Sequence, residues 1–175
     1  MRRLLLLRHA KAEKARPGER DFDRPLAERG RYHAPQVGAY LAKHAAAIDL
    51  ALVSPAARTR ETWELVAAEL TGAPKAVLDP RIYDAAPETL FAVVKDAKKS
   101  VRNLLMVGHN PALHELATLL TATGDIEARQ QLNEGLPTSG LVVIEFAFDE
   151  WSRLHAQSGR LAHFITPHSI ASAID

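Results

Sequence analysis

Short runs of consecutive apolar residues recur along the chain, separated by longer stretches in which apolar positions return every three or four residues. Such a run is typical of a strand in a parallel sheet, where both faces of the strand are covered. The runs expected to be strands are residues 4–7, 50–53, 76–78, 104–107, 141–148 and 161–165. The last two are expected to pair with each other across a loop around Ser158 and Gly159.

The intervening stretches have the periodicity of amphipathic helices. The expected helices cover residues 27–46, 55–71, 87–99 and 111–120. Ser54 and Asn110 each precede a proline, so we expect their side chains to cap the second and fourth helices, and we expect Gly72 to end the second.

Strands that alternate with helices of this length predict an α/β fold. We expect a three-layer α/β/α sandwich, in which helices cover both faces of a mostly parallel sheet of about five to six strands. No internal repeat or change of composition divides the sequence. We therefore expect one domain that spans residues 1–175.

The composition narrows the classes of partner. The chain has 175 residues and a formal net charge of +1 with interspersed charges, so nothing in it resembles a basic nucleic-acid-binding surface. It contains no cysteine, which excludes disulfides and thiolate chemistry and suits a reducing compartment. The apolar run at residues 4–7 is too short for a signal peptide or a membrane span. We expect a cytoplasmic protein that binds neither nucleic acid nor membrane.

Polar side chains directly follow three of the expected strands. Arg8 and His9 follow the first strand, Arg58 lies one turn into the helix after the second, and His109 follows the strand at residues 104–107. Ligands of such sheets bind outside the carboxyl ends of the strands. Arginine forks fit phosphate oxygens, a neutral histidine can attack phosphorus, and a second, protonated histidine can stabilise charge. If the strands are neighbours, the pattern predicts a phosphoryl-binding pocket with a histidine nucleophile.

Ordered motifs add a family resemblance. They are "LRHAKAE" at residues 7–13, "DRPLAERGR" at 23–31, "SPAARTRET" at 54–62 and "VGHNP" at 107–111, together with "IYDAAPETL" at 82–90. With these motifs the chain resembles the histidine phosphatase superfamily, also called the phosphoglycerate mutase-like superfamily. The short length, the "DRPL" segment and the lack of a helical insertion are most similar to the SixA-type phosphohistidine phosphatase branch.

The resemblance implies the phosphoglycerate mutase-like fold and a mechanism through phosphohistidine. In that mechanism His9 is transiently phosphorylated, while Arg8, Arg58 and His109 hold the phosphoryl group. Water then hydrolyses the phosphoenzyme. The resemblance implies no metal and no organic cofactor.

The group that would protonate the leaving atom is open. Larger relatives supply a carboxylate from the middle of the chain, whereas the SixA-like branch has no fixed counterpart. Asp84 and Glu88 are candidates here, with Asp21 and Asp23 as alternatives in a loop. A general acid typically contributes about 10² to 10⁴-fold to a rate, and a labile P–N bond needs that help less than a phosphate ester does.

Several polar residues near these motifs have a structural as well as a functional interpretation. For Asp23 we favour a structural role, either orienting the loop or pairing with Arg24 or Arg29, over a role in catalysis. Tyr83 fits core packing and site lining equally well. Residues 138–140 either line the pocket or form an ordinary turn.

The leading hypothesis is a phosphatase that acts on phosphohistidine in a partner protein, such as a histidine-containing phosphotransfer domain. The chain is too short for the lid that encloses small substrates, and residues 12–25 form a plausible mobile rim. One alternative is a phosphatase of a small phosphorylated metabolite, with Asp84 or Glu88 as the acid. Another is a phospho-dependent binding module without turnover. A mutase is disfavoured, because nothing here encloses its intermediate.

Overall fold

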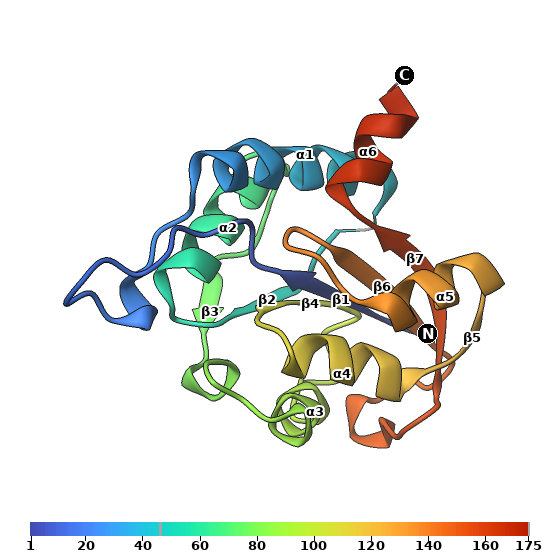
Figure 1. Cartoon of the computed structure of the whole chain (residues 1–175). Coiled ribbons are helices and arrows are strands. Elements are labelled where there is room, and N and C mark those ends of the chain that lie inside the picture. The colour runs from blue at the N-terminus through green and yellow to red at the C-terminus, as the bar shows by residue number, and fades with distance from the viewer. Residues whose placement is uncertain (46, 175) are drawn as a thin grey trace.

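A seven-stranded sheet runs through the centre of the molecule, between two layers of helices (Figure 1). The computed structural model describes residues 1–45 and 47–174. The strands are β1 (Arg2–Arg8), β2 (Leu50–Val53), β3 (Ala76–Leu78), β4 (Asn103–Gly108), β5 (Thr121–Gly124), β6 (Leu141–Phe146) and β7 (Gly159–Ile165). Their order across the sheet is β3-β2-β4-β1-β6-β7-β5.

The strand directions agree with a mostly parallel sheet. The pairs β1–β4, β2–β4, β2–β3 and β5–β7 are parallel, whereas β1–β6 and β6–β7 are antiparallel. β6 and β7 pair as expected across the connection that holds Ser158. The prediction of an α/β/α sandwich is therefore confirmed.

The prediction of five to six strands is wrong, because β5 was missed. Its four residues, Thr121–Gly124, carry no apolar run, and the strand lies at the edge of the sheet, where it pairs only with β7 among the strands. An edge strand needs no two-sided apolar pattern, so the sequence gives no signal for it. The helices at Ile126–Glu134 (α5) and Pro167–Ile174 (α6) were missed as well.

Helices cover both faces of the sheet. They are α1 (Glu28–His44), α2 (Ala57–Ala67), α3 (Pro87–Lys95), α4 (Ala112–Leu120), α5 (Ile126–Glu134) and α6 (Pro167–Ile174), with short 3-10 helices η1 (Asp21–Asp23), η2 (Pro80–Ile82) and η3 (Trp151–Arg153). Figure 1 shows α1, α2 and α6 above the sheet and α3 and α4 below it. Within the described residues, no helix is long and apolar enough to cross a membrane.

Two helix starts differ from the sequence prediction, and both differences involve polar side chains at the site. α2 begins at Ala57 and α4 at Ala112, and neither has a side-chain cap. The Ser54 hydroxyl instead contacts a histidine ring, and the Asn110 amide donates to a backbone carbonyl. The expected capping roles are thus wrong. α2 ends before Gly72, and α3 ends at Lys95 rather than at residue 99.

The four leucines of β1 explain why this strand is rigid. Leu4 and Leu6 pack in the core cluster that includes α3 and α4, whereas Leu5 and Leu7 pack in the cluster that includes α1 and α2. All four are essentially inaccessible to solvent. Burying each leucine side chain stabilises the folded protein by about 1.5–3 kcal/mol. The strand is therefore held firmly from both faces up to the residues that follow it.

Gly30, in the first turn of α1, gives a stability prediction with a clear sign. A Cβ at this position would lie 2.2 Å from the backbone oxygen of Lys11. In a helix that nothing contacts at that position, replacing glycine by alanine stabilises the folded protein by about 1 kcal/mol. We expect Gly30→Ala to destabilise the protein instead, by about 1–3 kcal/mol, because helix and loop must separate. Urea denaturation measures the change, and a variant as stable as the wild type would contradict this close packing.

Candidate active site

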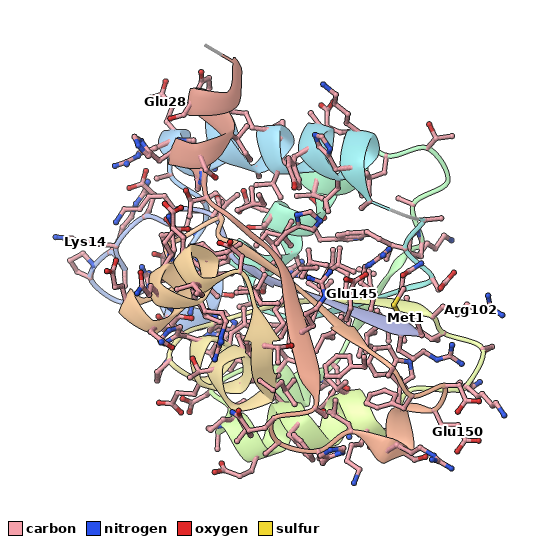
Figure 2. The ribbon with its side chains drawn as sticks, turned by 90° about the vertical axis from the view of Figure 1, so that its right-hand side faces the viewer. Met1, Lys14, Glu28, Arg102, Glu145 and Glu150 are labelled. Carbon is pink, nitrogen blue, oxygen red and sulfur yellow. The ribbon has the colours of Figure 1, made fainter. Side chains whose placement is uncertain are left out.

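Three neighbouring strands deliver the polar residues to one rim of the sheet. β4 lies between β1 and β2, with Arg8 beside Gly108 and Val53 beside Val107. The His9 backbone N–H continues the ladder by donating to the Gly108 carbonyl at 3.1 Å. The rim lies at the carboxyl end of β1, where Arg8 ends the strand. Figure 2 shows Lys14, in the segment that follows this end, on the opposite side of the molecule from Met1, which precedes the strand.

The structure brings the two predicted histidines into contact distance. The ring centroids of His9 and His109 lie 5.3 Å apart. Burial, and after it the positive charge of the nearby Arg58 and Arg8, lowers the pKa of both rings. All four residues predicted from the strand ends therefore gather in one place.

His9 is held as a neutral ring with a defined orientation. Its side chain is buried, and its Nδ1 lies 2.7 Å from the Ala10 carbonyl, which can only accept, so Nδ1 carries the hydrogen. Nε2 is then left with its lone pair. Burial, and next the positive charge of Arg58 and Arg8, lowers the pKa of His9 to about 4. At neutral pH the ring is uncharged and Nε2 can act as a nucleophile.

A buried threonine holds the turn after His9 against α2. The Thr62 hydroxyl accepts from the Ala10 N–H at 2.9 Å and donates to the Arg58 carbonyl at 2.7 Å. These two bonds connect the backbone on both sides of the site. The position of the His9 ring relative to Arg58 is therefore fixed by the fold rather than by a flexible loop.

The Arg58 guanidinium is anchored on a loop carboxylate. Arg58 is 6% exposed, and its Nη1 and Nη2 donate to the backbone oxygen and to Oδ2 of Asp21 at 2.8 and 3.0 Å. The same carboxylate accepts from the Tyr83 hydroxyl at 2.7 Å and from Arg24 Nη1 at 2.9 Å. These donors, Tyr83 first, hold the pKa of Asp21 well below its usual range. Asp21 is thus an ionised anchor.

Arg8 is anchored on the opposite side of the rim. Its Nη1 donates to the Leu136 carbonyl at 3.0 Å, and Asn110 Nδ2 donates to the same oxygen at 2.8 Å. The Ser139 N–H donates to the His9 carbonyl at 3.1 Å. The segment before β6 therefore closes the second wall of the site.

Several buried polar atoms at this rim have no hydrogen-bond partner among the described residues. They are Arg8 Nε, Arg58 Nε, His109 Nδ1, Asn110 Oδ1 and Ser139 Oγ. Burying an unpaired polar group is costly, and such groups are rare unless they serve a function. The arginine Nε atoms are obligatory donors, so an anion within hydrogen-bond distance of them would satisfy them.

Comparison with known proteins places this rim in a family. The model of the histidine phosphatase superfamily (branch 1) matches residues 4–86, which include Arg8, His9 and Arg58. A solved structure from Agrobacterium tumefaciens, provisionally assigned as the phosphohistidine phosphatase SixA, is 34% identical with a TM-score of 0.78. That likeness covers 95% of this chain and 98% of the other. The chain belongs to the histidine phosphatase superfamily. The membership predicted from the motifs is confirmed.

Other members of the superfamily extend the comparison. An uncharacterised protein of Mycobacterium tuberculosis H37Rv is 35% identical over 92% of this chain and 99% of its own length. The solved mycobacterial glucosyl-3-phosphoglycerate phosphatase is 17% identical with a TM-score of 0.59, over 92% of this chain and 97% of the other. At that identity only the fold is shared. The superfamily fold by itself therefore does not select a substrate.

The candidate carboxylates of this superfamily member differ in their contacts. Asp21 is the one that touches the site, through Arg58. Asp23 instead pairs with Arg20, Nε to Oδ2 at 2.9 Å, so the expected pairing of Asp23 with Arg24 or Arg29 is wrong. Asp84 and Glu88 are exposed and follow Tyr83 along the chain.

Two contacts were only partly foreseen from the sequence. The Tyr83 ring lies 5.6 Å from the His109 ring, edge to face, so Tyr83 lines the site rather than the core. The Leu136 carbonyl, which orients Arg8, has no sequence signal, because a backbone acceptor can belong to any residue. Across the described ranges, no group of three or more histidine, aspartate or glutamate side chains is arranged to hold a metal ion.

Proposed function

We propose that this phosphatase hydrolyses phosphohistidine in a partner protein through a phosphoenzyme formed on His9. His9 Nε2 attacks phosphorus, the P–N bond of the substrate breaks, and the departing imidazole takes up a proton from solvent water, which is returned to solvent when water attacks the phosphoenzyme. Water then attacks the phosphoenzyme, releases inorganic phosphate and restores neutral His9. The observation that carries this proposal is the neutral His9 ring, with its free Nε2, beside unpaired buried donors on Arg8 and Arg58.

The two arginines supply the charge that the transferred group needs. In this proposal Arg8 and Arg58 direct their free Nε groups at the phosphoryl oxygens, while their terminal nitrogens stay anchored on Leu136 and Asp21. Preorganised donors of this kind stabilise a transition state without reorganising when the reaction occurs. In this proposal His109, whose ring centroid lies 5.3 Å from that of His9, contributes a further donor. Asp21 then positions Arg58 and does not transfer a proton.

The leaving group is inferred from the state of the carboxylates. Asp21 is ionised and fully engaged by Tyr83, Arg24 and Arg58, which makes it a poor proton donor. A phosphate ester of an alcohol would lose most from the lack of an acid, whereas an imidazole leaves readily once it is protonated. The likeness to the Agrobacterium protein supports the same substrate class.

A small phosphorylated metabolite is the second candidate. Asp84 directly follows Tyr83, whose ring contacts His109, so a carboxylate could reach a leaving oxygen from that side. This mechanism predicts activity on phosphate esters that falls when Asp84 or Glu88 is replaced.

The deciding experiment offers the protein a labelled phosphohistidine. We expect a ³²P-labelled histidine-containing phosphotransfer domain to lose phosphate to the wild type and not to His9→Ala. A rapid-quench sample should contain labelled enzyme whose phosphate is lost in acid and kept in base, as expected for a P–N bond. Equal loss with both proteins would contradict the proposal. Tight phosphate binding without turnover would favour the binding-module alternative, and faster turnover of esters would favour a metabolite phosphatase.

We also propose that residues 1–175 act as one domain and that the protein works in the cytoplasm. Both core clusters share the central strands β1 and β4, which supports a single folding unit. The lack of cysteine suits a reducing compartment.

A further inference from the structure

We propose that Ser54 is a positioning residue that fixes His109 in the tautomer with its hydrogen on Nδ1. The inference deepens the proposed function, because it explains how the second histidine holds a phosphoryl group. It names a residue at the end of β2 whose sequence pattern pointed only to a helix cap. The tautomer of His109 can be measured directly, whether or not the protein turns over a substrate.

The hydroxyl hydrogen of Ser54 has one acceptor within reach. Ser54 is fully buried, and its Oγ lies 2.7 Å from His109 Nε2. Within the described part of the chain, the other contact of this Oγ is the N–H of Ala56 at 3.5 Å, which is a donor. The arrangement in which Ser54 donates to Nε2 satisfies the hydroxyl hydrogen. The reverse arrangement leaves that hydrogen buried without an acceptor, which is costly.

This bond determines what His109 presents to a ligand. If Nε2 accepts from Ser54, the neutral ring must carry its hydrogen on Nδ1. Nδ1 is buried and makes no hydrogen bond to any residue that the structure describes. In the proposed arrangement a phosphoryl oxygen accepts the hydrogen of Nδ1. In the other tautomer a lone pair would face the anion, and the interaction would be repulsive.

Neutral donation matters because the site disfavours a charged ring. The groups that face His109 are Arg58 from α2, Arg8 and His9 at the end of β1, and Asp21 with Tyr83 from the neighbouring segments. Burial, and next the charge of Arg58, lowers the pKa of His109 to about 3. In the free protein the second histidine is therefore a neutral donor.

The backbone of Ser54 is held independently of its side chain, so substitution should not unfold the rim. Its N–H donates to the Val107 carbonyl at 3.1 Å, and its carbonyl accepts from the Thr59 hydroxyl at 2.7 Å. Ser54→Ala removes only the hydroxyl. Ser54→Thr keeps a hydroxyl at the same branch point and serves as the conservative variant.

The experiment is ¹⁵N NMR of the histidine-labelled protein at neutral pH, with the His109 signals assigned from a His109→Gln variant. We expect wild type and Ser54→Thr to show a protonated Nδ1 and an unprotonated Nε2, and Ser54→Ala to shift toward hydrogen on Nε2. Tungstate, a tetrahedral oxyanion, should bind Ser54→Ala about 10-fold or more weakly, as expected for a lost charge-assisted hydrogen bond.

Ser158→Ala is the matched control, because Ser158 precedes β7 at the end of the sheet where Phe146 pairs with Arg2, far from the rim. It should leave both the tautomer and tungstate binding unchanged. A wild-type His109 with hydrogen on Nε2, or a Ser54→Ala spectrum like the wild type, would overturn the inference. If the tautomer holds but phosphohistidine is not hydrolysed, the proposed substrate fails while the role of Ser54 stands.

Discussion

Replacing His9 by asparagine is expected to lower kcat/KM for a phosphohistidine substrate by at least about 10³-fold, because the variant lacks the proposed nucleophile. Asparagine has an amide near the position of Nδ1, so it can keep the hydrogen bond to the Ala10 carbonyl, and it lacks the attacking Nε2. The turnover rate and the yield of trapped ³²P-enzyme measure the effect.

Binding should survive this substitution, since the anchors of Arg8 and Arg58 do not involve His9. Tungstate affinity should stay within about 10-fold of the wild type. His155→Asn, an exposed histidine between η3 and β7, is the control and should change neither quantity. A His9→Asn variant with near-normal turnover would exclude His9 as the nucleophile.

Replacing Arg58 by lysine is expected to lower kcat/KM by about 10² to 10³-fold, although the charge is kept. A lysine presents its three N–H donors from one nitrogen on a flexible chain, so it cannot reproduce the bidentate contact with Asp21 and at the same time place a separate donor at the position of Nε. Arg58 uses both terminal nitrogens for Asp21 and has Nε left over. Steady-state kinetics with the phosphohistidine substrate measure the loss.

Arg60→Lys is the matched control two residues along the same helix. Arg60 is exposed, and its Nε donates to the Pro55 carbonyl outside the site. It should keep its kcat/KM within about twofold, as is usual for surface substitutions. If the two variants lost activity equally, the effect would lie in the general charge of α2 and not in the fork of Arg58.

The central part of the fold and the gathering of the four site residues could be predicted, because both follow from strands buried on two faces. The runs at residues 4–7, 50–53 and 104–107 are apolar on both sides, and they became the adjacent strands β1, β2 and β4. Residues that directly follow adjacent parallel strands meet at one rim, regardless of the conformation of the loops. This is why Arg8, His9 and His109 could be placed together from the sequence.

The hydrogen bonds that complete the site could not be predicted, because they join segments whose separation only the folded chain defines. Asp21 and Asp23 lie in one loop with similar neighbours, yet the turn at η1 directs Asp21 to Arg58 and Asp23 to Arg20. Ser54 and Asn110 each precede a proline in a sequence typical of a helix cap. In the folded chain, however, Ser54 contacts His109 and the Asn110 amide donates to the Leu136 carbonyl. A side chain that could cap a helix locally bonds instead to a polar partner from a distant segment when the fold brings one within reach.

The position of β1 in the middle of the sheet has a consequence for biosynthesis. β1 lies between β4 and β6, whose residues are made about 100 and about 140 positions later than their partners in β1. Long-range pairing of this kind is slow, since the intervening chain must be synthesised and closed before the contact forms. If His9 is the nucleophile as proposed, it is thus translated before the strands on either side of it, and a nascent chain that still lacks β4 and β6 cannot accept phosphate in this pocket.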